Sequence, residues 1–239
     1  MAFSPQKLDA STLADRAYRE LRAAIMSGDL AAGVKITDRG LAESLSVSPT
    51  PVREAIRRLE QDRLVERISP RAFRVASYTP EQRAEVSLIE VNLRAMAARF
   101  AAQKITDTQL AELEDCLARA DAARAAAREV ADSPGSGDVV EPANQVIKTL
   151  RRFHQLVNEA SGNEILLHML EMAAAFTLGE RQRVLRQQLA DQVPPPEERY
   201  EQHRELFEAL KAHDAERAYE LMLTHGSRAR SDLLVRLTP

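Results

Sequence analysis

The sequence contains one cysteine, no long apolar run and few breaks in its helical patterning. The single thiol, Cys116, excludes an internal disulfide, and its place within a helical pattern predicts a buried, unreactive side chain. No segment approaches ~18 consecutive apolar residues, and the first residues lack the apolar core of a secretory signal. We therefore expect a soluble, cytoplasmic protein without a membrane span.

Signatures of common catalytic sites are also missing. The chain has no H-E-x-x-H helix, no G-x-S-x-G elbow, no glycine-rich phosphate loop and no cysteine with a catalytic partner. These absences argue against an enzyme. Strand-like patterns of β-branched residues are almost absent after Pro80, which favours an all-helical second half.

Charge is distributed unevenly along the 239 residues. The whole chain has 33 Lys and Arg against 36 Asp and Glu, a net charge of -3. Residues 1–76 contain 13 of the basic and 10 of the acidic residues, so this part is about +3 and the other 163 residues about -6. The N-terminal part is therefore the better match for a polyanionic partner.

Two short helices near the N-terminus form a helix-turn-helix pattern. Residues 37–45 predict a short helix, and Ser46 to Ser48 predict a tight turn. In the next helix, we expect Thr50 as N-cap and Pro51 at the first helical position. Its apolar stripe consists of Val52, Ala55, Ile56 and Leu59.

A β-hairpin follows the second of these helices. Residues 64–68 and 73–76 have strand composition and flank a Ser-Pro-Arg turn, so the pattern predicts a wing. Thr79 and Pro80 then predict the capped start of a long helix. We expect a winged helix-turn-helix domain over residues 1–78 and a second domain over residues 79–239.

Helical periodicity continues through the second domain. Breaks are expected at a loop over residues 133–138 and at the prolines of residues 194–196. The predicted fold is mainly α, with three helices and a small hairpin joined to an all-α antiparallel bundle. The predicted bundle helices span about 80–103, 106–131, 143–160, 162–190, 196–212 and 214–237.

The polar face of the second short helix has the chemistry needed to bind DNA. Arg53, near the helix start, can form two hydrogen bonds to a guanine edge, and Arg57 lies one turn further along the same face. Ser48 and Thr50 can donate to phosphate oxygens, and Arg39 can brace the DNA backbone.

Arg71 lies at the predicted tip of the wing, where a long cation can enter the minor groove. Arg58, Arg67 and Arg74 add positive charge nearby. The alternative interpretation is a solvated helix face whose arginines pair with Glu54, Glu60 and Asp62. The order of helix, turn, capped helix and hairpin favours DNA binding.

Residues 18–75, which include GDLAAGVKITDRGLAESLSVSPTPVREAIRRLEQDRLVE, resemble the DNA-binding domain of the GntR family of bacterial regulators. The resemblance implies that Arg39, Ser48, Thr50, Arg53 and Arg71 contact DNA. The chain has Arg63 and Ala72 where the family usually has glycine, and Pro49 where arginine is frequent.

The second half resembles the FCD ligand-binding domain of the FadR-type subgroup, through motifs such as Arg-Phe-His at residues 152–154 and Gln-His-Arg-Glu at residues 202–205. Many such proteins bind a divalent metal with one carboxylate and three histidines, and the metal helps to hold a carboxylate effector. The resemblance implies a zinc-like site at His154, His203 and His225. Each of these histidines lies on the apolar stripe of its own helix.

The chain departs from the subgroup's usual pattern at three positions. Leu150 stands where the carboxylate ligand is usual, and Asn92 and Met96 stand where an arginine and a glutamate are common. Asn92 and Asn163 are the candidate effector contacts. A core role without metal remains the alternative for each histidine.

The combined expectation is a DNA-binding transcription regulator, acting as a repressor and a homodimer on palindromic operator DNA, whose affinity responds to a small-molecule effector. Two alternatives use the histidines differently. One is a metal-dependent hydrolytic enzyme, and the other is a regulator for which the metal itself is the signal.

Overall fold

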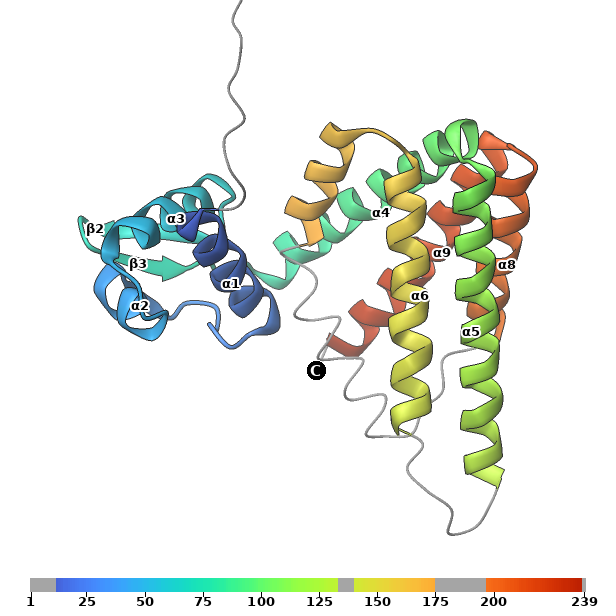
Figure 1. The fold of residues 1–239 in the computed structure, drawn as a ribbon, viewed down its shortest axis with the longest axis horizontal. Helices are drawn as coiled ribbons and strands as arrows, with labels where there is room; N and C mark the ends of the chain where they lie inside the picture. Colours follow the sequence, from blue (N-terminus) through green and yellow to red (C-terminus); the bar gives the residue numbers. More distant parts are fainter. Residues whose placement is uncertain (1–11, 133–139, 175–196, 238–239) are drawn as a thin grey trace, which may run out of the picture. The chain divides into compact units, whose positions relative to one another are not determined.

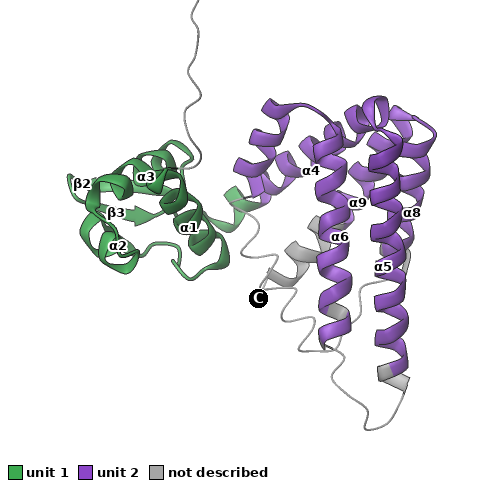
Figure 2. Ribbon diagram, viewed as in Figure 1, with its two compact units in different colours: residues 1–83 green, residues 84–239 purple. Residues whose placement is uncertain are grey.

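The computed structural model describes residues 12–132, 140–174 and 197–237. The chain divides into two compact units, Met1–Arg83 and Ala84–Pro239 (Figure 2). The loop predicted at residues 133–138, the prolines of residues 194–196 and the end of the helix predicted to reach residue 190 lie outside the described residues.

The first unit consists of short helices and a small antiparallel sheet with strand order β1-β3-β2 (Figure 1). Its first helix begins with a capping box between Thr12 and Asp15 and ends at Gly28, whose φ of 87° is accessible to glycine at little cost. Its elements are α1 (Leu13–Ser27), β1 (Lys35–Thr37), α2 (Asp38–Ser44), α3 (Pro49–Gln61), β2 (Val65–Ser69) and β3 (Ala72–Val75).

The core of this unit lies under α3. The predicted stripe is confirmed, because each of its four side chains is fully buried, and α1 packs against the same helix. Phe73 and Val75 of β3 are also buried, so the sheet covers part of the core. The buried stripe of α3 is Val52, Ala55, Ile56 and Leu59.

Two local predictions differ from the structure. The helix predicted to start after Thr50 begins at Pro49, with Ser48 as N-cap. Because the first four N–H groups of a helix have no intrahelical partner, Pro49 and Pro51 both fit within the first turn. The sequence also did not predict β1, which pairs with β3 but has only one buried side chain, Ile36.

The second unit is a helical bundle. In it α6 packs against α5, α5 against α8, and α8 against α9 (Figure 1). Hydrogen bonds between Thr79 and Gln82 cap α4, so the cap predicted at Thr79 is confirmed, and Asp214 caps α9 by accepting from the backbone N–H of Arg217. The helices are α4 (Pro80–Lys104), α5 (Asp107–Asp132), α6 (Val140–Ala160), a helix over 164–174, α8 (Glu197–Lys211) and α9 (Ala215–Leu237).

Helices α4 and α9 approach closely at Gly226. A Cβ atom added to Gly226 would lie 3.0 Å from Cγ1 of Val91, a side chain that is 1% exposed. Cys116 is buried in the main apolar cluster of the bundle, as predicted, and burial raises the pKa of its thiol.

Candidate nucleic-acid interface and histidine cluster

The turn between α2 and α3 is held by local hydrogen bonds. Thr37 caps α2 by accepting from the N–H of Gly40 at 3.1 Å. The N–H of Val47 donates to the carbonyl of Ala42 at 3.0 Å, and Ser46 adopts a left-handed φ of 54° to turn the chain. This geometry is the predicted helix-turn-helix.

The polar side of α3 begins with exposed hydroxyl and guanidinium groups. Thr50, Arg53 and Arg57 are exposed, while the opposite side of the helix is anchored in the core. Ser48 is also exposed, and its side chain makes no capping hydrogen bond. Ser48 and Thr50 lie at the helix start, Arg53 in the second turn and Arg57 in the third, in the N-terminal part of the helix where a major-groove reader makes its base contacts.

Asp38 joins α2 to the polar side of α3. Its carboxylate is 3% exposed and accepts from Nε of Arg53 at 2.7 Å. The hydrogen bond from Arg53 holds the pKa of Asp38 below its ordinary value, against the opposing effect of burial; the backbone N–H of Arg39 and the charge of Arg71 also lower it. Asp38 therefore pairs directly with the side chain of Arg53, whereas Arg39 acts on it through its backbone N–H and Arg71 through its charge.

The wing places Arg71 in the exposed turn between β2 and β3. Arg67 does not extend outward as a second wing cation, because it pairs with Glu60 at 2.8 Å and lies over the ring of Phe73. The hydrogen bond from Arg67 to Glu60 raises the pKa of the guanidinium.

Arg58 has a structural contact that the sequence pattern did not predict. Its guanidinium donates to Asp15 of α1 at 2.5 Å and lies 4.1 Å from the ring centroid of Tyr18. The Tyr18 hydroxyl in turn donates to Asp62, and burial raises the pKa of Tyr18 to about 12. Arg58 therefore ties α3 to α1, whereas Arg53 and Arg57 remain on the polar side of α3.

In the second unit, three histidines from three helices converge. One ring nitrogen each from His154 (α6), His203 (α8) and His225 (α9) lies within 4.8 Å of the other two. The Nε2 atoms of His154 and His203 are 3.1 Å apart, and His203 is 4% exposed. The ring of Phe153 packs edge-on against both of those rings. We call these three residues the histidine cluster.

Two members of the histidine cluster have a hydrogen-bond partner at Nδ1, the second nitrogen of the ring. Nδ1 of His203 lies 3.3 Å from the carbonyl oxygen of Tyr200, and Nδ1 of His225 lies 3.0 Å from Oε1 of Gln202. Such outer partners direct the remaining ring nitrogen toward a bound ion. Among the described residues, no carboxylate or thiolate joins the cluster.

The histidine cluster fits a divalent cation with neutral ligands. Zinc binds imidazole nitrogen at about 2.0–2.1 Å, so two ligand nitrogens in a tetrahedral shell are about 3.4 Å apart. The 3.1 Å between the Nε2 atoms of His154 and His203 is close to that value, and all three ligand nitrogens lie within 4.8 Å of one another. Imidazole suits zinc, copper, nickel and iron.

A tyrosine network supports α8 beside the histidine cluster. Tyr200 is 5% exposed, and its hydroxyl donates to Asp121 of α5 at 2.6 Å. Arg204 also pairs with Asp121, and the guanidinium of Arg124 lies 3.7 Å from the Tyr200 ring centroid. Burial, together with the hydrogen bond to Asp121, raises the pKa of Tyr200 to about 12.

The two asparagines expected to contact an effector have local roles. Asn92 is exposed on α4, and its amide donates to the carbonyl of Leu88. Asn163 accepts from the N–H of Leu166 at 3.1 Å and so caps the helix over 164–174. Neither contact involves the histidine cluster, and effector binding by these asparagines stays a prediction.

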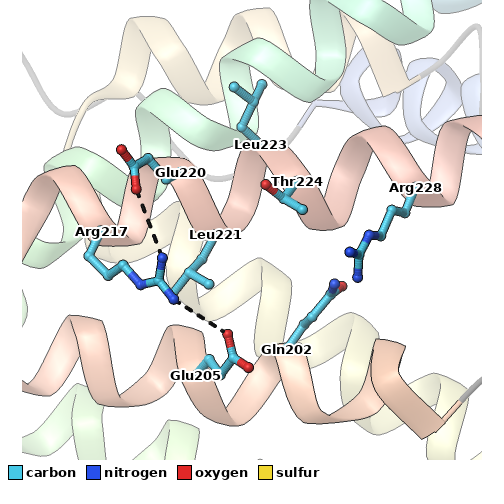
Figure 3. A pocket seen from close by; sticks show the side chains of 8 residues that line it. All are labelled: Gln202, Glu205, Arg217, Glu220, Leu221, Leu223, Thr224 and Arg228. Atoms are coloured by element: carbon cyan, nitrogen blue, oxygen red, sulfur yellow. Dashed lines mark ion pairs between the residues drawn. The ribbon is translucent and has the colours of Figure 1, made fainter.

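An open pocket of about 460 Å³ lies between α8 and α9 (Figure 3). Arg217 lies on one wall, within 3.7 Å of Glu205 and 3.9 Å of Glu220. The same pocket reaches Gln202, the residue that holds His225. Its lining consists of Gln202, Glu205, Arg217, Glu220, Leu221, Leu223, Thr224 and Arg228.

Comparison with known families accounts for both units. The model described as bacterial regulatory proteins of the gntR family matches residues 13–75, and the FCD domain model matches residues 85–228. The chain belongs to the GntR family. Within it, the FCD domain is consistent with the FadR-type subgroup that the sequence resembles.

Known relatives span most of the chain. It is 29% identical over 212 residues to the regulator McbR of Escherichia coli, covering 88% of this chain and 87% of McbR. It is 28% identical over 208 residues to the repressor RspR of Escherichia coli, covering 87% of this chain and 83% of RspR. The solved structure of Escherichia coli McbR/YncC matches with a TM-score of 0.71 and 26% identity, covering 96% of this chain and all of that one.

These findings assign the GntR-type unit to DNA binding and the protein to transcription regulation. The hydrolytic interpretation of the histidine cluster is therefore wrong, because the family and the relatives are regulators rather than enzymes. Among the described residues, no helix has both the length and the apolar character needed to cross a bilayer.

Proposed function

We propose that the chain is a repressor that binds a palindromic operator as a two-fold dimer and releases it when a small molecule binds the FCD domain. The observation that carries the DNA-binding half is the exposed polar start of α3, opposite a fully buried stripe. The repressor assignment is supported by relatives that are named repressors, RspR and GlaR of Escherichia coli.

The proposed contacts follow from the chemistry of each side chain. Arg53 reads a guanine edge, with Arg57 one turn further along the groove. Ser48 and Thr50 donate to phosphates at the start of α3. Two further cations complete the interface, with Arg39 on the DNA backbone and Arg71 in the minor groove.

The experiment that tests DNA recognition is selection from a random duplex pool, followed by fluorescence anisotropy at two salt concentrations. The expected result is a two-fold symmetric site whose affinity falls with salt, as phosphate contacts require. Recovery of no preferred sequence would overturn the operator-binding proposal.

Exposed apolar side chains on α4 and on the helix over 164–174 support the dimer. The helix over 164–174 packs on α4 through Leu166, Leu170 and Ala97. Next to this contact, large apolar side chains are exposed at helical spacing on both helices, a pattern that marks interfaces. They are Leu88, Ile89, Met96, Ile165 and Met169.

Sedimentation velocity tests the dimer surface. We expect the chain with Met96→Glu and Ile165→Glu to sediment as a monomer at micromolar concentration, because a desolvated carboxylate opposes association. Leu13→Glu, at an exposed apolar residue of α1, is the matched control and should leave the dimer intact. A dimeric double variant would place the interface elsewhere.

We propose that His154, His203 and His225 hold a divalent cation. A bound cation would supply a Lewis-acidic contact for a carboxylate effector. The support is the convergence of three neutral ligands, two of them with outer partners. Leu150 precedes His154 by one helical turn, so α6 supplies no carboxylate from that position.

Elemental analysis of protein purified with and without chelator tests the cation site, and His203→Ala should lower the metal content. Operator binding measured with metal alone, and then with small carboxylates added, separates the metabolite response from a purely metal-responsive regulator.

A regulator that binds operator DNA acts in the cytoplasm, where its operator lies.

A further inference from the structure

Gln202 occupies an unusual position beside the histidine cluster. It directly precedes His203 in α8, is 8% exposed, and reaches across to His225 of α9. Its Oε1 lies 3.0 Å from Nδ1 of His225. An amide oxygen only accepts hydrogen bonds, so this contact places the ring proton of neutral His225 on Nδ1 and the lone pair on Nε2.

The two outer partners in the cluster differ in one respect. His203 is held by the backbone carbonyl of Tyr200, which can only accept a hydrogen bond. His225 is held by a side-chain amide, which presents an oxygen or an NH₂ group according to its orientation. The tautomer of His225 therefore depends on the side chain of Gln202.

The surroundings of Gln202 favour the oxygen. Figure 3 shows the guanidinium of Arg228 and the amide of Gln202 pointing toward one another across the α8–α9 pocket. A guanidinium carries only donors, so a nearby amide is stabilised when it presents its oxygen, the atom that lies 3.0 Å from Nδ1 of His225.

We propose that Gln202 is a positioning residue that keeps His225 protonated on Nδ1, so that its Nε2 faces a cation shared with His154 and His203. The proposal rests on the cation site proposed above. Outer partners of metal-bound histidines change metal affinity by about 10-fold to 100-fold when they are removed.

Competition with a chromophoric chelator, using zinc alone as the probe, tests the proposal on the full chain. Gln202→Leu should weaken zinc binding by about 10-fold to 100-fold, whereas Gln202→Glu, which keeps an acceptor, should retain the affinity of the natural chain. Gln155→Leu is the matched control, because Gln155 is exposed on α6 and pairs with Glu159. Zinc affinity within twofold of the natural chain in Gln202→Leu would overturn the proposal.

A second measurement does not depend on zinc or on a variant that folds. The ¹⁵N shifts of the His225 ring in metal-free protein should show a protonated Nδ1, and protonation of Nε2 instead would overturn the proposal. Absence of zinc binding in the natural chain, with Nδ1 protonated, would refute the cation site and leave the role of Gln202 in the tautomer supported.

Discussion

The carboxylate of Asp38 holds Arg53 through a 2.7 Å contact to Nε. The carboxylate is buried, but the Arg53 side chain is 52% exposed, so the guanidinium is anchored at one edge and presented to solvent at the other. Anchoring reduces the side-chain entropy that Arg53 loses when it binds a base. The pair therefore prepares Arg53 for base recognition.

Asp38→Asn is expected to reduce sequence discrimination. Loss of one negative charge near the DNA should strengthen binding to random duplex. Loss of the charge that orients Arg53 should lower the ratio of specific to random affinity by about tenfold. Anisotropy with both duplexes measures the ratio. Glu43→Gln, an exposed carboxylate on α2, is the control for charge alone and should leave the ratio unchanged.

Arg53→Ala and Arg58→Ala separate recognition from stability. Arg53→Ala should cost about 1–3 kcal/mol of discrimination at one base pair, because a two-pronged contact is lost. Arg58→Ala should leave base preference intact and lower the melting temperature, because Arg58 binds Asp15 and stacks on Tyr18. Unchanged discrimination in Arg53→Ala would mean that another surface reads the DNA.

Arg63→Gly is expected to stabilise the DNA-binding unit. Arg63 follows the end of α3 with a φ of 61°, a left-handed conformation that costs a non-glycine residue about 1–2 kcal/mol. The carbonyl of Arg63 accepts from the Tyr78 hydroxyl at 2.7 Å, a bond that glycine keeps. Urea unfolding should show a gain of about 1 kcal/mol, and a loss would contradict the assignment of strain.

Tyr200→Phe tests the network that links α8 to α5. The variant loses the hydroxyl bond to Asp121 and should cost about 1 kcal/mol of stability at pH 7. Burial works to raise the pKa of Asp121, but Tyr200 and Arg204 outweigh it and hold the value below the ordinary 3.8. The ionised Asp121 carboxylate therefore adds stability above about pH 4, and this contribution is lost as the pH falls below that value. In thermal unfolding, Tyr200→Phe should lose less stability between neutral and acid pH than the natural chain does.

Periodicity and capping chemistry were enough to predict most of the helices. The buried stripe of α3 and the caps at Thr79 and Asp214 depend on residues close together in the chain, which a local pattern reveals. The resemblance to the FCD domain grouped the three histidines, their places on the apolar stripes agreed with it, and the structure brings their rings together.

Contacts that depend on tertiary structure escaped the sequence analysis. Strand β1 has three residues and gains its partner only when β3 folds beside it. Asp38 is fifteen positions from Arg53, and an acidic residue in the first turn of a helix is explained equally well by the helix dipole. Gln202 belongs to the Gln-His-Arg-Glu motif, but its contact with His225 was not predicted, because that partner lies on another helix.

The absence of a side chain at Gly226 brings the backbone of α9 against Val91 of α4, directly after His225. Because the two helices touch at this point, a shift of α9 would press on Val91 of α4. Since α4 begins at Pro80, with only four residues between it and the end of β3, a displacement of His225 would reach the helix that continues the chain from the DNA-binding unit.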